Sequence, residues 1–208
     1  MVGQPTRDRR AERREATRLE IVEAAWEVAR ERGLAAMTLK EVAERIGMRA
    51  PSLYGHFASK LAIIDAMFGQ AWEQYLAVGR GAYADLPEAP REVLLAVART
   101  YFDFAVADPV RHQLMDTAVV PGFRPSPEAY APSLAVMAQL VGLLEGLGLG
   151  DPDDRDIFTA LVGAMVSQQL ANDPGGERWR RLLPRVVDMY ADNTGLPGPP
   201  LTPLREGS

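Results

Sequence analysis

The chain has 208 residues, of which 47% are hydrophobic and 25% are charged, values that are ordinary for a globular protein. It has no cysteine, which excludes a disulfide framework, a thiolate zinc site and a thiol redox switch. The net charge of −5 is unevenly distributed: residues 1–60 hold 12 basic and 9 acidic side chains, and residues 61–208 hold 11 and 19. The N-terminal part therefore carries +3 and the rest −8, which favours contact between the N-terminal part and a polyanion.

The sequence also predicts the cellular compartment of the protein. No run approaches the ~20 apolar residues of a membrane span, and the chain does not open with the charged-then-apolar pattern of a signal peptide. We therefore expect a cytoplasmic protein without membrane contact. The sparse histidines and the lack of cysteine also argue against a metal site, and no cofactor is expected.

The sequence predicts an all-α fold, because long alternating stretches and hairpin turns between apolar runs are missing. A first helix is expected over 11–32, and Gly33 ends it. Thr38 and Glu41 form a capping box that starts a short second helix, which lasts to residue 46. The other helices are expected at 50–57, 59–82, 91–106, 108–119, 128–147, 151–171 and 177–193, with a kink or a fresh start at Pro184 in the last one.

Residues 38–57 have the dimensions of a helix-turn-helix, which consists of two short helices joined by a few residues that include a glycine. Gly47 allows the tight exit from the first of these helices, and Pro51 lies in the first turn of the second, where its missing N–H is harmless. The apolar side chains expected between the helices are Val42, Ala43, Ile46, Leu53 and Phe57.

The second helix of this pair has the composition of a recognition helix, which offers small and polar side chains to base edges while its flanks hold phosphates. Side chains suited to base edges or to a thymine methyl group are Arg49, Ala50, Pro51 and Ser52. Side chains suited to phosphates are Tyr54, His56 and Lys60. Shape alone leaves a second interpretation open, a helical hairpin that merely packs on its neighbours.

The stretch IVEAAWEVARERGLAAMTLKEVAERIGMRAPSLYGHFASKLAIIDAMF, residues 21–68, resembles the DNA-binding region of the TetR family of bacterial regulators. The specific parts are Gly33, Thr38 with Val42-Ala43, Ile46-Gly47, and Leu53-Tyr54-Gly55-His56-Phe57 followed by Lys60. The resemblance implies that Thr38 and Lys40 approach DNA from the first short helix. It places Arg49, Ala50, Ser52 and Gly55 on the base-reading surface, and Tyr54, His56 and Lys60 at phosphates. Gly55 departs from members that have a bulky residue there.

The resemblance also implies an organisation for the whole chain. Residues 1–16 are expected to form a basic flexible arm, 17–62 the three-helix DNA-binding domain, 63–194 a helical ligand-binding and dimerisation domain, and 195–208 a disordered tail. The arm, which carries Arg7 to Arg14, resembles extensions that enter the minor groove in some members, and a solvated arm is the alternative.

The C-terminal domain offers candidates for two further sites. Apolar side chains on its middle helices, with one amide, are expected to line an effector pocket: Trp72, Tyr101, Phe102, Met115, Phe123, Met137, Met165 and Gln168. Small and apolar side chains on its last two helices are expected to form the interface of a two-fold homodimer: Ala160, Gly163, Ala164, Ser167, Trp179, Leu183, Val186 and Tyr190.

The sequence therefore predicts a regulator, most simply a repressor, that binds a pseudo-palindromic operator in double-stranded DNA as a homodimer and is released by a small hydrophobic or aromatic effector. No enzyme motif is present, and the glycines at 146, 148 and 150 end a helix instead of forming a phosphate loop. The alternatives are a helical interaction module that has lost DNA binding, an activator, and a regulator without a ligand.

Overall fold

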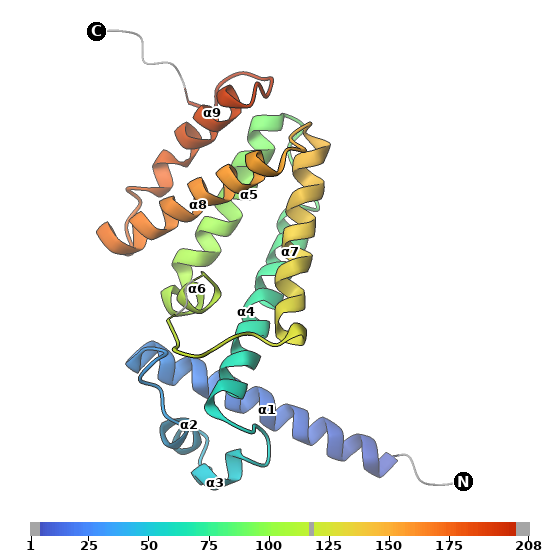
Figure 1. Cartoon of the computed structure of the whole chain (residues 1–208), viewed down its shortest axis with the longest axis vertical. Helices are drawn as coiled ribbons and strands as arrows, with labels where there is room; N and C mark the ends of the chain where they lie inside the picture. Colours follow the sequence, from blue (N-terminus) through green and yellow to red (C-terminus); the bar gives the residue numbers. More distant parts are fainter. Residues whose placement is uncertain (1–4, 117–118, 203–208) are drawn as a thin grey trace. The chain divides into compact units, whose positions relative to one another are not determined.

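The computed structural model describes residues 5–116 and 119–202, and in these residues the fold is all-helical, without a strand (Figure 1). The all-α expectation is thereby confirmed. The elements are α1 (Pro5–Arg32), α2 (Leu39–Arg45), α3 (Ala50–Leu53), α4 (Lys60–Ala82), α5 (Pro90–Ala107), α6 (Pro109–Asp116), α7 (Pro127–Gly146), α8 (Pro152–Asn172), the 3-10 turn η1 (Arg180–Leu182) and α9 (Leu183–Asn193). Over the described residues, none of the helices has the length and apolar character that crossing a membrane requires.

The chain divides into two compact units, and the division differs from the one expected at residue 62. Unit 1 contains the described residues up to Ala71 together with those of the segment 113–131, and unit 2 contains Trp72–His112 and the described residues from Pro132 onward. Helices α4, α6 and α7 therefore each contribute residues to both units.

The segment before and at the start of α7 belongs to unit 1 because it binds the first half of α4. The Ser126 backbone N–H and hydroxyl each donate to the Asp65 carboxylate, both at 2.7 Å. The Phe68 ring meets the Phe123 ring edge-on, with 6.0 Å between centroids. The predicted boundary at residue 62 would place all four of these residues in the C-terminal domain, whereas the structure places them in unit 1.

The core of unit 1 joins α1 to the two short helices and to α4. The buried stripe of α1 includes Ile21, Ala25 and Ala29, each 0% exposed, at the four-residue spacing of one helix face. The Trp26 indole N–H donates to the Gln70 side-chain oxygen at 2.6 Å, which ties α1 to α4 at their polar edge. Helix α2 packs on both α1 and α3, which fixes the two short helices in unit 1.

Unit 2 is built around α5, which packs against both α8 and α9 (Figure 1). Its most deeply buried side chains include Leu94, Phe102, Val166 and Leu183, none more than 1% exposed. Arg91 at the start of α5 donates to Asp188 and Asp192 of α9 at 3.3 and 2.6 Å. These charged groups join α5 to α9 at the edge of the apolar core.

The two ends of the described chain are more regular than predicted. Helix α1 begins at Pro5 instead of near residue 11, so residues 5–16, expected as a flexible arm, are helical. After α9, Leu196 is 4% exposed, and the backbone N–H groups of Leu201 and Thr202 both donate to the Asp188 carboxylate at 2.9 Å. Residues 195–202 are therefore packed on unit 2 and not a disordered tail, while the tail prediction for 203–208 lies outside the described residues.

Candidate nucleic-acid interface

Helix α2 begins at the predicted capping box. The Thr38 hydroxyl accepts from the Glu41 backbone N–H at 3.3 Å, and the Glu41 carboxylate accepts from the Thr38 backbone N–H at 3.2 Å. At the other end Gly47 has φ of 66°, a left-handed conformation that side chains with a Cβ rarely adopt. Each end of α2 is thus fixed by the residue that the sequence suggested.

Helix α3 is shorter than predicted, since it ends at Leu53 and not near residue 57. The backbone N–H groups of Gly55 and His56 bond three residues back, to Ser52 and Leu53, in place of the four-residue step of an α-helix. The chain therefore tightens into a turn at Tyr54–His56 before α4. Leu53 and Phe57 are nevertheless buried, as predicted, at 1% and 4% exposure, so the turn leaves the packing pattern intact.

Most of the side chains predicted to meet DNA are exposed on α2, α3 and this turn, and Lys60 begins α4. Tyr54 is 60% exposed although the adjacent Leu53 is buried, so the hydroxyphenyl group points to solvent. Residues classed as exposed are Thr38, Lys40, Arg49, Pro51, Ser52, Tyr54 and Gly55, and residues classed as half-buried are Ala50, His56 and Lys60. All ten belong to unit 1, and their joint contact with DNA stays a prediction.

Two of the expected phosphate donors have partners inside the protein. Lys60 donates to the Ala35 carbonyl at 2.8 Å, and burial lowers the pKa of its ammonium group. The Nδ1 atom of His56 is buried without a hydrogen-bond partner among the described residues, so this atom is turned away from solvent. A phosphate would have to compete with the carbonyl for Lys60 or reach the other ring nitrogen of His56.

Sequence reasoning missed two arginines that join α1 to the turn after α3. Arg14 donates to the Gly55 carbonyl at 3.3 Å, and Arg18 donates to the His56 carbonyl. The Arg18 guanidinium also lies over the Phe57 ring, 4.1 Å from its centroid. The dense arginine run was visible in the sequence. Nothing in that run indicated that two of its side chains bond to the backbone of residues 55 and 56.

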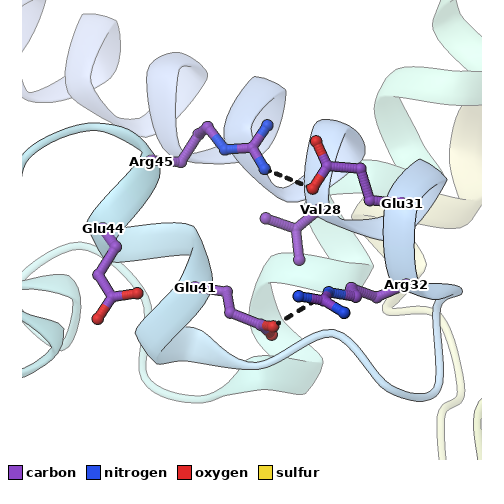
Figure 2. Close-up of a pocket in the computed structure, with 6 residues that line it drawn as sticks. All are labelled: Val28, Glu31, Arg32, Glu41, Glu44 and Arg45. Carbon is purple, nitrogen blue, oxygen red and sulfur yellow. Dashed lines mark hydrogen bonds and ion pairs between the residues drawn. The ribbon is translucent and has the colours of Figure 1, made fainter.

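A charged pocket of about 370 Å³ lies between α1 and α2 and is lined by Val28, Glu31, Arg32, Glu41, Glu44 and Arg45 (Figure 2). Figure 2 shows Arg45 pointing to Glu31 and Arg32 pointing to Glu41, at 2.7 and 3.5 Å. The hydrogen bond from Arg45 lowers the pKa of Glu31, and that from Thr38 lowers the pKa of Glu41. Effector pockets are mostly apolar, so we interpret these pairs as ties between α1 and α2.

The predicted effector-pocket residues are distributed over both units. Trp72, Tyr101, Phe102, Met137, Met165 and Gln168 belong to unit 2, and Met115 and Phe123 belong to unit 1. Phe102 and Met165 are core side chains of unit 2. Met137 is 41% exposed, and the exposed Gln168 accepts a hydrogen bond from Asn172 of its own helix at 2.7 Å. Gln168 is thus placed on the surface of α8, which corrects its expected place in a pocket wall.

An aromatic cluster in unit 2 was only partly anticipated. Tyr75 lies at its centre, with ring centroids 5.3 Å from Tyr101 and 5.1 Å from Phe104, and Trp72 lies 6.4 Å away. The Tyr75 and Tyr83 hydroxyls are 3.2 Å apart, and burial raises the pKa of both. His112 is buried, at 7% exposure. The cluster combines apolar faces with hydroxyl groups.

The predicted dimer residues divide between surface and core. Ala160, Ala164 and Ser167 are exposed along one side of α8, and Gly163 has no atom within 4 Å of where a Cβ would lie. Trp179 and Val186 are half-buried. Leu183 and Tyr190, at 0% and 3% exposure, fill the core of unit 2 and cannot meet a partner. Ile157 and Met189, which sequence reasoning missed, are exposed instead at 44% and 64%.

Two short helices on a third, with polar residues exposed on the second, define a helix-turn-helix DNA-binding protein. Residues 21–67 match the model of the bacterial regulatory proteins of the tetR family. The chain is 31% identical over 166 residues to the class A tetracycline repressor protein of transposon 1721 from Escherichia coli, across 76% of this chain and 69% of that protein. The chain belongs to the tetR family and is a transcriptional regulator.

Two further comparisons extend this result. The transcriptional activator FasR of Mycolicibacterium smegmatis is 32% identical over 102 residues, which cover 49% of this chain and 46% of that protein. The fold resembles the crystal structure of the transcriptional regulator FadR from Bacillus subtilis in complex with stearoyl-CoA, with a TM-score of 0.61 and 17% identity, covering 83% of this chain and 96% of that one. The second likeness concerns the fold alone.

Proposed function

We propose that this regulator binds a pseudo-palindromic operator as a homodimer, with α3 of each subunit in the major groove, and that a small hydrophobic or aromatic effector releases it. The observation that carries the proposal is the exposed polar side of α3 and the following turn, above all Tyr54 at 60% exposure beside the buried Leu53. An exposed aromatic hydroxyl and an exposed arginine on a rigidly packed helix suit phosphate and base contacts.

The residues have different proposed roles. Arg49 and Ser52 read base edges, Ala50 and Pro51 contact a thymine methyl group, and Gly55 lets the turn approach the groove. Thr38, Lys40, Tyr54, His56 and Lys60 hold phosphates on either side. The weak 3.7 Å pair between Lys40 and Glu44, both largely exposed, would open when a phosphate approaches.

The proposed dimer uses the exposed side of α8 and α9. Ala160, Gly163 and Ala164 allow close helix approach, and the exposed Ile157 and Met189 supply apolar area. Two helices from each subunit would form a four-helix interface with two-fold symmetry. The same symmetry would present two α3 helices to half-sites about one turn of DNA apart, or a multiple of it.

The proposed effector site is the aromatic cluster around Tyr75 in unit 2, where ring faces and hydroxyls suit an apolar or aromatic compound. Helix α4 carries Lys60 in unit 1 and Tyr75 in unit 2, so a ligand that shifts this helix would move residues of both units. A difference of ~1–3 kcal/mol in effector affinity between the two states is enough for regulation. The alternative sign of regulation is activation, which the likeness to FasR favours. We infer no enzymatic role, since the relatives are regulators.

The test begins with selection of a binding duplex from random-sequence DNA, followed by fluorescence anisotropy with the full chain. Arg49→Ala should weaken operator binding about 10- to 100-fold, because a lost base contact costs ~1–3 kcal/mol, while non-operator DNA binds nearly as before. Arg49 makes no side-chain capping bond, so folding should be preserved. Arg80→Ala, at an exposed arginine of α4 in unit 2, is the matched control. Failure to enrich any duplex would contradict DNA recognition and favour the interaction module.

A further inference from the structure

The N-terminal turns of α1 separate basic from acidic side chains around the helix. At about 100° per residue, Arg9, Arg10, Arg13, Arg14 and Arg18 all fall within one half of the circumference. Glu12 and Glu15 fall in the other half. Arg9, Arg10, Arg13 and Arg14 are all exposed. A helix with this distribution presents a continuous positive stripe, which an irregular arm of the same composition would not.

The positive stripe is held beside the turn after α3. The exposed Arg14 and the half-buried Arg18 donate to the Gly55 and His56 carbonyls, which lie at the end of the proposed DNA-reading segment. Arg10 precedes Arg14 by four residues, so the two lie on the same side of the helix about 6 Å apart. The stripe therefore continues the surface of α3 and its turn toward the N-terminus.

We propose that the exposed arginines of this stripe, Arg9, Arg10 and Arg13, bind phosphates of duplex DNA flanking the half-site that α3 reads. This inference rests on the proposed function and adds a binding site to it. An α-helix is about 10–12 Å across, whereas the minor groove is about 6 Å wide. The helical segment thus lies against the sugar–phosphate backbone and does not enter the minor groove, so it adds affinity and register without sequence preference.

The experiment compares the full chain with the variant Arg10→Gln/Arg13→Gln on two duplexes that contain the selected operator. One duplex extends about 10 base pairs, one helical turn, beyond each half-site, and the other stops at the half-site edges. Each phosphate contact contributes about −0.9 to the slope of log K against log salt. Two arginines in each of two subunits should make the slope on the long duplex shallower by about 3 to 4. On the short duplex the variant and the parent should bind alike.

The controls separate this inference from a general charge effect. Arg80→Gln/Arg99→Gln removes the same charge from exposed positions of unit 2 and should leave both slopes unchanged. An equal loss in this control, or an unchanged slope for Arg10→Gln/Arg13→Gln while the parent binds the operator, would overturn the inference and leave the proposed function standing. A fall in the ratio of operator to scrambled-duplex affinity would indicate base reading and would overturn backbone binding. If the parent itself shows no operator preference, the proposed function fails first.

Discussion

At the scale of single residues, the same side chain can hold the fold together and face a ligand. Lys60 was expected to meet a phosphate, and it donates to the Ala35 carbonyl. That bond joins the start of α4 to the loop that follows α1. Replacing Lys60 would therefore remove a structural tie along with any phosphate contact, which is why Arg49 is the better test of DNA binding.

The raised pKa of Tyr190 predicts that the folded protein loses stability at alkaline pH. Its hydroxyl donates to the Asp154 carbonyl at 3.1 Å, and burial, with a smaller contribution from the Asp154 charge, raises its pKa to about 12. In the unfolded chain a tyrosine ionises near pH ~10. The stability that Tyr190 contributes is therefore complete below pH ~10 and is lost as the pH rises from there to about 12, by at most about 1.4 kcal/mol per pH unit.

Urea unfolding of the parent and of Tyr190→Phe between pH 8 and pH 12 measures this effect. At pH 8 the variant should be less stable by about 1 kcal/mol, because the hydrogen bond is lost. As the pH passes 10 the parent should lose stability faster, and the difference should narrow. A difference that stays constant over the whole range would contradict the raised pKa.

At the scale of elements, the close contact between α4 and the start of α7 within unit 1 depends on a glycine. A Cβ on Gly69 would lie 3.3 Å from the Ala129 Cα atom, a contact that backbone cannot easily relieve. Gly69→Ala should therefore gain less than the ~0.5–1 kcal/mol that replacing a helix glycine by alanine normally gains. Gly69→Val should destabilise by ~1–3 kcal/mol, because the added atoms overpack the contact.

Gly142 of α7 is the matched control, since it is exposed, lies inside a helix, and has no atom within 4 Å of the position of a Cβ. Gly142→Ala should gain the full helix-propensity term. Urea midpoints at one fixed protein concentration give the comparison. Equal gains at both positions would mean that α4 and α7 are not tightly apposed at Ala129.

The lengths of the short helices show how far local signals extend. The capping box at Thr38 and the glycine at 47 fixed α2 at both ends, because each acts on the backbone next to it. The end of α3 had no comparable signal. Its turn is held by Arg14 and Arg18, which are about 40 residues away in sequence.

At the scale of the whole molecule, the proposed dimer makes a prediction about the exposed side of α8. Ala164 is exposed there, and glutamate is a good helix former, so Ala164→Glu should leave the fold of each chain unchanged. In a two-fold interface the new charges of both copies would be desolvated near each other. Light scattering after size exclusion should show a dimer for the parent and a monomer for the variant, with operator affinity reduced accordingly.

Ala138→Glu is the control, because Ala138 is an exposed alanine on another helix of unit 2, α7. This variant should remain dimeric. Loss of the dimer in Ala138→Glu with retention in Ala164→Glu would move the interface to α7. A parent that is monomeric at every concentration would contradict the dimer itself.

The sequence by itself determined the all-α fold, the two ends of α2 and the start of a new helix at Pro184. It also determined which side chains of the helix-turn-helix are buried, namely Val42, Ala43, Leu53 and Phe57. These features depend on periodicity, on capping groups and on the fixed φ of proline, all of which act within a few residues. The dense and continuous resemblance over 21–68 also supplied the candidate DNA-contacting set, which stays a prediction.

Only the tertiary structure decided the rest. It extended α1 to Pro5, joined residues 119–131 to the first half of α4, buried Leu183 and Tyr190, and packed residues 195–202 on Asp188. Each outcome depends on a partner distant in sequence or on which side of a helix meets the core. Periodicity shows that a helix has an apolar face, but only packing against α5 determines which side chains of α8 and α9 are buried.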